Sequence, residues 1–339
     1  MFFQKKKISL NKLYPKLRFK NNHQIEDVKP LHVASGNDLT FFDSIKYKIE
    51  ANSTKAKTCI TTHKLENYLP KNINKIIVEN VLYELSLVIK KIYLLADIDY
   101  PDQSLKKPHK ISYKNVNFGN NVLVGRNVKI GKNSFIGSNT IIEHDVKIGT
   151  NCIIGSNVII KNSIIGDNVV IQDGNKIGQK GFGFIPQKDK NIKFPHIGRV
   201  LIHDNVEIAS GCTIDRGSID DTVIGENTYL DNQVHIAHNV KIGSNCMIAG
   251  QVGFAGSSSV GNNVMIGGQA GISGHLKIGN GVKIGGGSGV VKNIEDNQTV
   301  MGYPAMPFKD FLKKNKSWVQ RKLIKKQLKN SYPTENLCF

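Results

Sequence analysis

Residues 224–243, IGENTYLDNQVHIAHNVKIG, place one large apolar residue at every sixth position. A small or acidic residue usually follows it, and another short residue comes four places after it. Neither the 3.6-residue period of an α-helix nor the two-residue period of a strand matches this spacing. We therefore predict a left-handed parallel β-helix, in which three six-residue units complete each coil of a triangular prism. The period holds without a break at Ile224, Leu230, Ile236, Ile242, Ile248, Phe254, Val260, Ile266, Ile272, Ile278, Ile284 and Val290.

Two histidines in this run, His238 and His275, follow the repeat positions Ile236 and Ile272. These positions are two whole coils apart, and stacked strands lie about 4.8 Å from each other. The histidines should therefore share one side of the prism at a separation of roughly 10 Å, the size of a substrate head group. Imidazole titrates near neutral pH and suits a general base, whereas a lone outward histidine is more often a solvated surface residue.

The same period begins near Phe118, but three irregularities interrupt it. The step after Ile160 is one residue short, residues 179–199 form a long excursion, and four extra residues follow Ile214. Insertions into repeat proteins collect on the binding face, so we expect the excursion to be used in binding.

The residues before the repeats mix strand-like and helix-like patterns, with Asn80 placed to cap a helix that extends to Leu95. This composition predicts a small α/β domain, followed by a linker over residues 101–108. After the repeats, apolar residues at helical spacing predict an amphipathic helix from about Pro307 to Lys329. The expected domains are residues 1–105, 106–303 and 304–339.

The chain carries a formal net charge of +19, and its tail is strongly basic. Residues 309–330 contain nine Lys or Arg and one acid, Asp310. Such a field favours anionic partners: nucleic acid, lipid head groups, nucleotide-sugar diphosphates or an acidic carrier protein. Solvated lysines of a generally basic proteome are an equally acceptable explanation.

The five cysteines show no disulfide-like or metal-like spacing, and three of them occupy short core positions of the repeat. They are typical of reduced thiols that fill a core. The chain begins without a signal-peptide pattern and contains no long apolar run, so we expect a soluble, cytoplasmic protein. We also expect no metal and no cofactor.

Several motifs together resemble the bacterial UDP-3-O-acylglucosamine N-acyltransferases of lipid A synthesis. The motifs are Thr213-Ile-Asp-Arg-Gly217, Asp220-Asp-Thr222, Asp231-Asn-Gln233, Ile236-Ala-His-Asn239, Ile248-Ala-Gly250, Gly274-His275, Gly181-Phe-Gly-Phe184 and Pro195-His-Ile-Gly-Arg199. The resemblance implies a homotrimer with active sites in grooves between subunits. It also implies transfer of a 3-hydroxyacyl group from acyl carrier protein to the 2-amine of UDP-3-O-acyl-glucosamine.

The resemblance also implies roles for individual residues of the prism. His238 would be the general base, and the backbone N–H of Gly256, one coil further on, would stabilise the oxyanion. His275 and Asn232 would bind substrate in the same groove. Asp231 would orient His238, or would be only the small acidic residue that this repeat position accepts.

The segment 39–47 resembles the family's uridine-binding segment. Phe41 would stack on uracil and Tyr47 would flank it, unless Phe41 only packs the core of its domain. The family commonly has Asn where this chain has Ser44, and a serine hydroxyl cannot offer the paired donor and acceptor of an amide.

The stretch Gly285-Gly-Gly-Ser-Gly289 removes side chains near the end of the repeats. We interpret Gly285, Gly287 and Gly289 as part of an acyl-chain channel, because a bare surface leaves room for methylenes. The basic tail would then bind the acidic acyl carrier protein, its trimer mates or, at most, the membrane surface, rather than nucleic acid.

Three other interpretations stay open at this point. His235, His238 and His275 could be zinc ligands of a hydratase, although His235 and His238 leave the coil in different directions. A coenzyme A-dependent sugar acetyltransferase would use the same prism. A non-catalytic scaffold would bind nucleic acid or a membrane through the basic tail.

Overall fold

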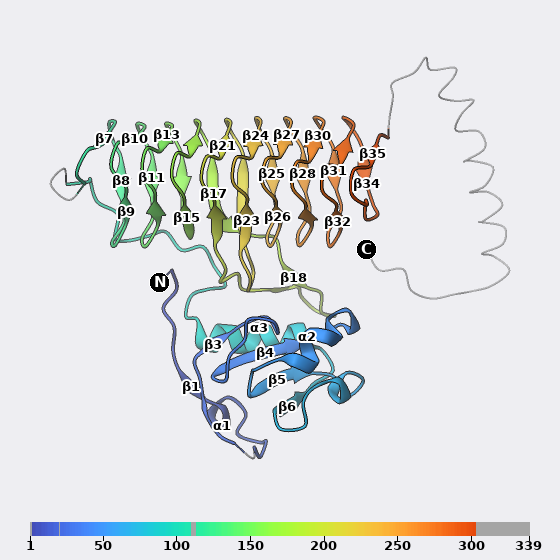
Figure 1. Cartoon of the computed structure of the whole chain (residues 1–339). Helices are drawn as coiled ribbons and strands as arrows, with labels where there is room; N and C mark the ends of the chain where they lie inside the picture. The colour runs from blue at the N-terminus through green and yellow to red at the C-terminus, as the bar shows by residue number, and fades with distance from the viewer. Residues whose placement is uncertain (1, 20, 110–112, 303–339) are drawn as a thin grey trace. The chain divides into compact units, whose positions relative to one another are not determined.

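A computed structural model describes residues 2–19, 21–109 and 113–302 (Figure 1). The helix expected from about Pro307 to Lys329 and the tail that follows it lie outside the described residues. Contacts group residues 1–301 into one compact unit.

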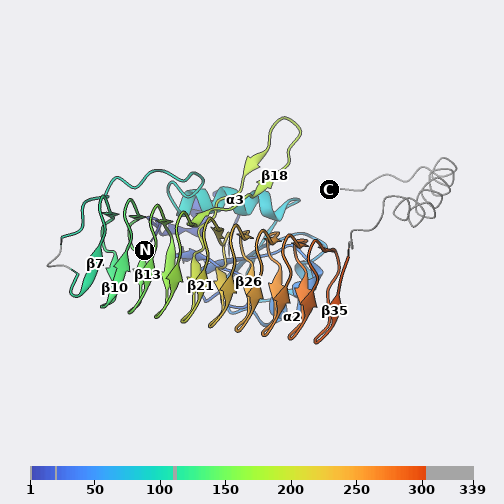
Figure 2. The same cartoon turned by 90° about the horizontal axis from the view of Figure 1, so that it is seen from above.

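The repeats form a parallel β-helix with three sheets, as the six-residue period predicts (Figures 1 and 2). The ten-stranded sheet contains β7 (Val116–Phe118), β10 (Ser134–Ile136), β13 (Ile153–Ile154), β16 (Val170–Ile171), β21 (Glu207–Ile208), β24 (Tyr229–Leu230), β27 (Met247–Ile248), β30 (Met265–Ile266), β33 (Lys283–Ile284) and β35 (Thr299–Val300). The nine-stranded sheet contains β8 (Leu123–Val124), β11 (Ile141–Ile142), β14 (Ile159–Ile160), β17 (Lys176–Lys180), β22 (Thr213–Arg216), β25 (His235–Ile236), β28 (Gly253–Phe254), β31 (Gly271–Ile272) and β34 (Gly289–Val290). The eight-stranded sheet contains β9 (Lys129–Ile130), β12 (Lys147–Ile148), β15 (Ser163–Ile165), β20 (Val200–Ile202), β23 (Thr222–Ile224), β26 (Lys241–Ile242), β29 (Ser259–Val260) and β32 (Lys277–Ile278).

The interior of the prism is filled by the two classes of repeat position that the sequence singles out. The large apolar residues, such as Ile236 and Phe254, are buried in a single hydrophobic core. The short residues four places later are buried as well, and Thr228 donates its hydroxyl hydrogen to the carbonyl of Gly243. Cys152, Cys212 and Cys246 occupy the same class of position as buried free thiols. Each coil therefore buries its apolar side chains against the coils on both sides.

Most corners of the prism hold one residue with a positive φ, usually asparagine. Asn227, Asn239 and Asn245 have φ values of 55°, 61° and 58°. Asparagine tolerates this left-handed conformation better than other non-glycine residues. Along one corner Asn227 donates its amide to the side chain of Asn245, so asparagine also links successive coils.

The N-terminal part is an α/β fold with its own cores. Its parallel sheet has the order β3 (Asp27–Val28), β4 (Asp38–Phe42), β5 (Thr58–Thr61) and β6 (Asn74–Ile77). Two helices, α2 (Lys48–Ser53) and α3 (Val81–Ile92), accompany it, and the expected cap is present because Asn80 accepts from the N–H of Tyr83. The hairpin β1 (Ile8–Ser9) and β2 (Gln24–Ile25) encloses the short helix α1 (Leu10–Leu13).

The segment expected as a linker is bonded to the first coils of the prism. Asp102 accepts from the N–H of His144, and Lys106 pairs with Val124. Just before this segment, Asp99 forms a salt bridge of 2.6 Å with Arg216, whose side chain is fully buried. The α/β part and the prism are thus joined by polar contacts as well as by the chain.

Candidate active site

All three irregularities of the repeat fall on one edge of the prism, between the nine-stranded and eight-stranded sheets. The short step lies between β14 and β15, the excursion between β17 and β20, and the extra residues between β22 and β23. The excursion contains a hairpin, β18 (Phe184–Ile185) with β19 (Ile192–Lys193), which projects from the stacked coils (Figure 2). The next corner on this edge, between β25 and β26, carries His238.

Asn239 fixes the ring of His238. The Nδ1 atom of His238 lies 3.0 Å from Oδ1 of Asn239. Oδ1 also accepts from the backbone N–H of Ser218, and the amide nitrogen of Asn239 donates to the carbonyl of Asp220. These two contacts settle the amide orientation, so Nδ1 of His238 must be the donor. The lone pair of the imidazole is therefore on Nε2, which leaves that atom able to accept a proton.

Gly256 lies directly against this ring. A Cβ atom on Gly256 would stand 2.7 Å from Cε1 and 2.8 Å from Nε2 of His238. The N–H of Ser257 donates to the carbonyl of His238, which stacks the two corners in consecutive coils. Because residue 256 is glycine, space remains between its backbone and Nε2 of His238.

His275 continues the same corner one coil further on. Its backbone N–H donates to the carbonyl of Gly256 at 3.1 Å, and its exposed side chain extends from a corner residue with φ 59°. Burial raises the pKa of Asp43, and the nearby His275 acts in the opposite direction. Asp43 stands between Phe41 and Ser44, so this electrostatic interaction links the expected uridine segment to the His275 side of the prism.

The expected uridine-binding residues lie at the end of β4 and in the turn after it. Phe41 is half-buried and packs against the N-terminal core, which agrees in part with the packing alternative. Ser44 is half-buried, and Tyr47 is 47% exposed. No hydrogen bond from the Ser44 side chain occurs within the part of the chain that the structure describes.

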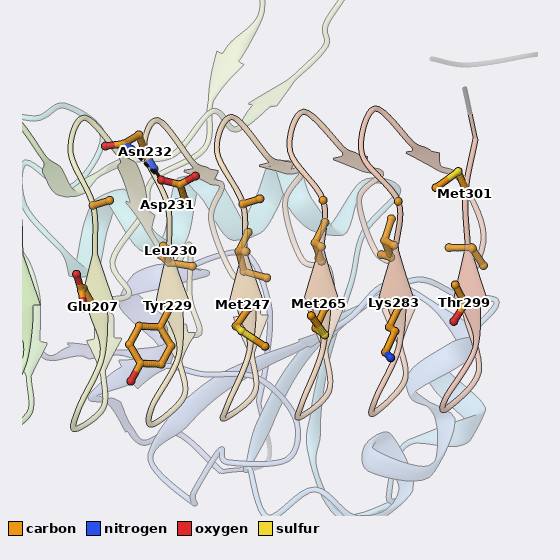
Figure 3. A pocket seen from close by; sticks show the side chains of 18 of the residues that line it. Glu207, Tyr229, Leu230, Asp231, Asn232, Met247, Met265, Lys283, Thr299 and Met301 are labelled. Carbon is orange, nitrogen blue, oxygen red and sulfur yellow. Dashed lines mark hydrogen bonds between the residues drawn. The ribbon is translucent and has the colours of Figure 1, made fainter. Parts of the chain in front are cut away.

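Asp231 and Asn232 lie on the opposite edge of the nine-stranded sheet, at the corner between β24 and β25 (Figure 3). Asp231 accepts from both the backbone and the side-chain amide of Asn232. They border a groove of about 770 Å³ along the ten-stranded sheet, whose outward side chains include Tyr229, Met247 and Met265. Within the chain, the acceptor that contacts Nδ1 of His238 is Asn239, and Asp231 lies at the other edge of the sheet, so the role expected for Asp231 stays a prediction. Asn232 and His238 are separated by one face of the prism because six residues span a face.

The three glycines expected to form one bare surface do not lie together. A Cβ on Gly285 would meet the side chain of Met301, and Gly287 is a corner residue with φ 66°. Gly289 instead pairs in register with Gly271, which pairs with Gly253. A Cβ on any of these three would meet nothing within 4 Å. The open surface therefore runs along the prism axis, down the outer face of the nine-stranded sheet.

Buried charges lie on the same face near the junction with the N-terminal part. Arg216 is the largest fully buried side chain, and its charge holds the pKa of Asp99 below the usual range against the effect of burial. Lys161 lies 3.2 Å from Glu143 and 3.6 Å from Asp99. Burial raises the pKa of Asp215 to about 7. Ion pairs therefore connect Arg216 with Asp99 and Lys161 with both Asp99 and Glu143.

The zinc interpretation finds no support in the geometry. His235 lies on the outer face of β25, where its Nδ1 is 2.7 Å from the hydroxyl of Thr213, while His238 lies beyond the corner. Among residues 2–19, 21–109 and 113–302, no group of three or more His, Cys, Asp or Glu side chains is arranged to hold a metal ion. In the same residues, no helix is long and apolar enough to cross a membrane.

Comparison with known proteins finds similarity in both parts of the molecule. Residues 127–162 and 221–256 match the bacterial transferase hexapeptide model, which describes six-residue repeats. Residues 22–90 match the model of UDP-3-O-(3-hydroxymyristoyl) glucosamine N-acyltransferase, LpxD. The N-terminal part of the chain is thus similar to the LpxD family over residues 22–90. Its match covers the sheet β3 to β6 and most of α3.

Curated relatives carry the corresponding enzyme name. A UDP-3-O-acylglucosamine N-acyltransferase of Rhizobium rhizogenes is 58% identical over 80 residues, which cover 24% of this chain and 22% of the relative. The protein of the same name from Rhizobium etli is 60% identical over 78 residues, 23% of this chain and 22% of the relative. The matched regions thus span about a fifth of the length of these LpxD-type relatives. Among solved structures, a UDP-N-acetylglucosamine acyltransferase from Campylobacter jejuni has a TM-score of 0.49 at 22% identity, over 65% of this chain and 86% of that one.

Two residues of the site were missed by the sequence analysis. Asn239 directly follows His238, and its position at a corner that requires positive φ disguised it as a structural asparagine. His196 lies in the excursion, 40 or so residues from His238 in sequence, and packs against its ring. The motif that contains His196 was visible in the sequence, but only the fold shows what the side chain contacts.

Proposed function

We propose that the protein transfers an (R)-3-hydroxyacyl group from acyl carrier protein to the 2-amine of UDP-3-O-(3-hydroxyacyl)-glucosamine. The product would be the UDP-2,3-diacylglucosamine of lipid A biosynthesis. The observation that carries this proposal is the pairing of a proton-accepting Nε2 on His238 with the open backbone of Gly256, in a chain with an LpxD domain.

In the proposed reaction the 2-amine attacks the thioester carbon, and a C–N bond forms. The carbonyl oxygen becomes an oxyanion, which the backbone N–H of Gly256 stabilises by about 3 kcal/mol. Nε2 of His238 removes a proton from the attacking nitrogen. The C–S bond then breaks, the proton passes to the departing thiolate, and an amide and the free carrier thiol remain.

The substrate would span both parts of the chain. Phe41 stacks on uracil, Tyr47 flanks it, and Ser44 gives a single hydrogen bond in place of the paired contacts of an amide. His275 binds the phosphate or sugar near Gly256. The electrostatic interaction between Asp43 and His275 supports this arrangement.

Asn232 would reach the site from a neighbouring subunit of a homotrimer. His238 and Asn232 border opposite edges of the nine-stranded face within one chain, which supports a site that two copies complete. Closed symmetric assemblies bring such different edges together at every interface.

The acyl chain would follow the bare column of Gly253, Gly271 and Gly289 rather than the surface of Gly285 and Gly287. Each buried methylene contributes about 0.8 kcal/mol. The basic tail would attract the acidic carrier protein, and at most a peripheral contact with the membrane, in the cytoplasm.

The test is acyl transfer from 3-hydroxyacyl carrier protein to UDP-3-O-(3-hydroxyacyl)-glucosamine by the wild type and by His238→Ala. We expect transfer by the wild type and a loss of about 10²–10⁴-fold in kcat for the variant, because it lacks its base. Size-exclusion chromatography with light scattering serves as the control for assembly. Failure of the wild type to use either substrate, or preference for an acetyl-coenzyme A donor in competition, would refute the proposal.

A further inference from the structure

His196 is a buried histidine that the proposed reaction does not use. Its side chain is 0% exposed, and it lies in the excursion between β17 and β20. Its Nδ1 is 3.0 Å from the carbonyl of Phe194, so Nδ1 carries the hydrogen and donates it. The Nε2 lone pair of His196 is buried and has no hydrogen-bond partner among the described residues. A buried acceptor without a donor is costly and calls for an explanation.

The ring of His196 packs on the ring of His238. The ring centroids are 5.0 Å apart at an interplanar angle of 69°, an edge-to-face arrangement. Nε2 of His196 and Cδ2 of His238 each lie 3.0 Å from the point that a Cβ on Gly181 would occupy. The unpartnered lone pair and the carbon edge of the base thus border the same small space.

The surrounding chain holds His196 in this position. A Cβ on Gly183 would stand 2.6 Å from Cε1 of His196, so the excursion wraps closely around the ring. The carbonyl of His196 accepts from Nε of Arg216 at 2.9 Å, and Arg216 is itself fixed by Asp99. The ring therefore cannot turn away from His238 without breaking buried contacts.

The groups around His196 keep it neutral. Burial lowers the pKa of His196 to about 3, and the facing charges of His238, Lys180 and Arg216 act in the same direction. Its lone pair is thus present throughout the pH range in which His238 would work as a base.

We propose that His196 is a positioning residue, which holds the ring of His238 on the side opposite Asn239 and favours its protonated form through the neutral Nε2 lone pair. This inference rests on the proposed function for its place in the reaction. When His238 accepts the proton from the amine, its C–H edge becomes more positive. A lone pair beside that edge stabilises the cation through weak C–H contacts.

Two variants separate ring packing from the lone pair. His196→Phe keeps a ring of similar size and removes both nitrogens, whereas His196→Gln keeps a polar acceptor without a ring. Because phenylalanine leaves the Phe194 carbonyl without its donor, thermal unfolding and trimer content are recorded for each variant.

The first readout is the pH dependence of kcat with the two proposed substrates. We expect His196→Phe to move the acid-side midpoint down by about 0.5 pH unit and to lower kcat about threefold at an unchanged KM. His196→Gln should restore the midpoint in part.

The second readout needs no transfer activity. Diethyl pyrocarbonate acylates neutral imidazole, and peptide mapping gives the rate at His238 as a function of pH. The same downward shift is expected at His238 in His196→Phe, with no modification of His196 in the folded wild type. Equal midpoints in wild type, His196→Phe and His196→Gln would overturn the inference. A wild type without transfer but with shifted His238 reactivity would refute the proposed function alone.

Discussion

At the scale of the residue, the proposed base His238 is oriented by the asparagine beside it. Asn239 is held by Ser218 and Asp220, and it fixes which nitrogen of His238 bears the hydrogen. In catalytic triads a carboxylate orients the histidine in the same way, whereas here the orienting group is a neutral amide. A neutral partner orients the ring without adding charge to a half-buried site.

Removal of the Asn239 side chain should lower the rate while leaving the fold intact. Asn239→Gly suits the test because glycine adopts the φ of 61° at this corner without strain. We expect kcat to fall about 100-fold with little change in KM, since the ring of His238 loses its orientation.

A matched control exists at the next corner. Asn245 has φ 58° and accepts a hydrogen bond from Asn227, away from His238. Asn245→Gly should show a similar loss in thermal stability and unchanged kcat. Equal loss of activity in both variants would show that general loosening of the corners, and not orientation of His238, causes the effect.

Motif resemblance and coil counting pointed to His238 and Gly256, which lie against each other in the structure, but they pointed to Asp231 and not to Asn239 as the partner of His238. Asp231 is closer to the usual chemistry of such a partner than Asn239. The difference arises because hydrogen-bond partners depend on the corner in which a side chain lies. A displacement of six residues moves a side chain to another edge.

At the scale of the element, the nine-stranded sheet carries the surface on which the proposed acyl site lies. Its register aligns Gly253, Gly271 and Gly289 on the outer face, and its two edges carry His238 and Asn232. Periodicity predicted which positions are buried, because each core position repeats every six residues. The same eighteen-residue spacing relates the three glycines of the bare column, but the run Gly285 to Gly289 drew attention to neighbours in sequence and not to neighbours in adjacent coils.

Filling the bare column should shorten the preferred acyl chain. Gly271→Met adds a flexible apolar side chain at a position where a Cβ meets nothing within 4 Å. We expect the rate with the longest accepted 3-hydroxyacyl donor to fall about tenfold, because roughly two methylenes lose their site. Rates with donors shorter by two to four carbons should change little.

The control places the same side chain on another face of the prism. Ser259 lies on β29 of the eight-stranded sheet, away from the column. Ser259→Met should leave the chain-length profile unchanged. An unchanged profile in Gly271→Met would remove the column as the acyl site.

At the scale of the whole molecule, a single chain separates residues that the proposed reaction needs together. His238 and Asn232 lie on opposite edges of one face, while the proposed uridine-binding residues Phe41 and Tyr47 belong to the α/β part. Sequence analysis predicted the family and the repeat architecture, since both are written in local patterns. Which residues meet across two copies depends on the symmetry of the assembly and is not written in either pattern.

Mixed trimers test whether two chains build each site. His238→Ala and Asn232→Ala should each be nearly inactive alone. Co-expression in equal amounts should restore about a quarter of wild-type activity, because one interface in four then combines two unsubstituted edges. Activity no greater than that of the separate variants would show that both residues serve the same chain's site.

The gathering of every irregularity on one edge of the prism has a consequence for how such a molecule can change. The other two edges repeat regularly, and each coil contacts only the coils next to it. The edge between the nine-stranded and eight-stranded sheets carries the irregularities and breaks this repeat. Coils near the ends of the prism can therefore change without disturbing this edge, but loss of the last coils would remove Gly271 and Gly289 and shorten the proposed acyl-chain column.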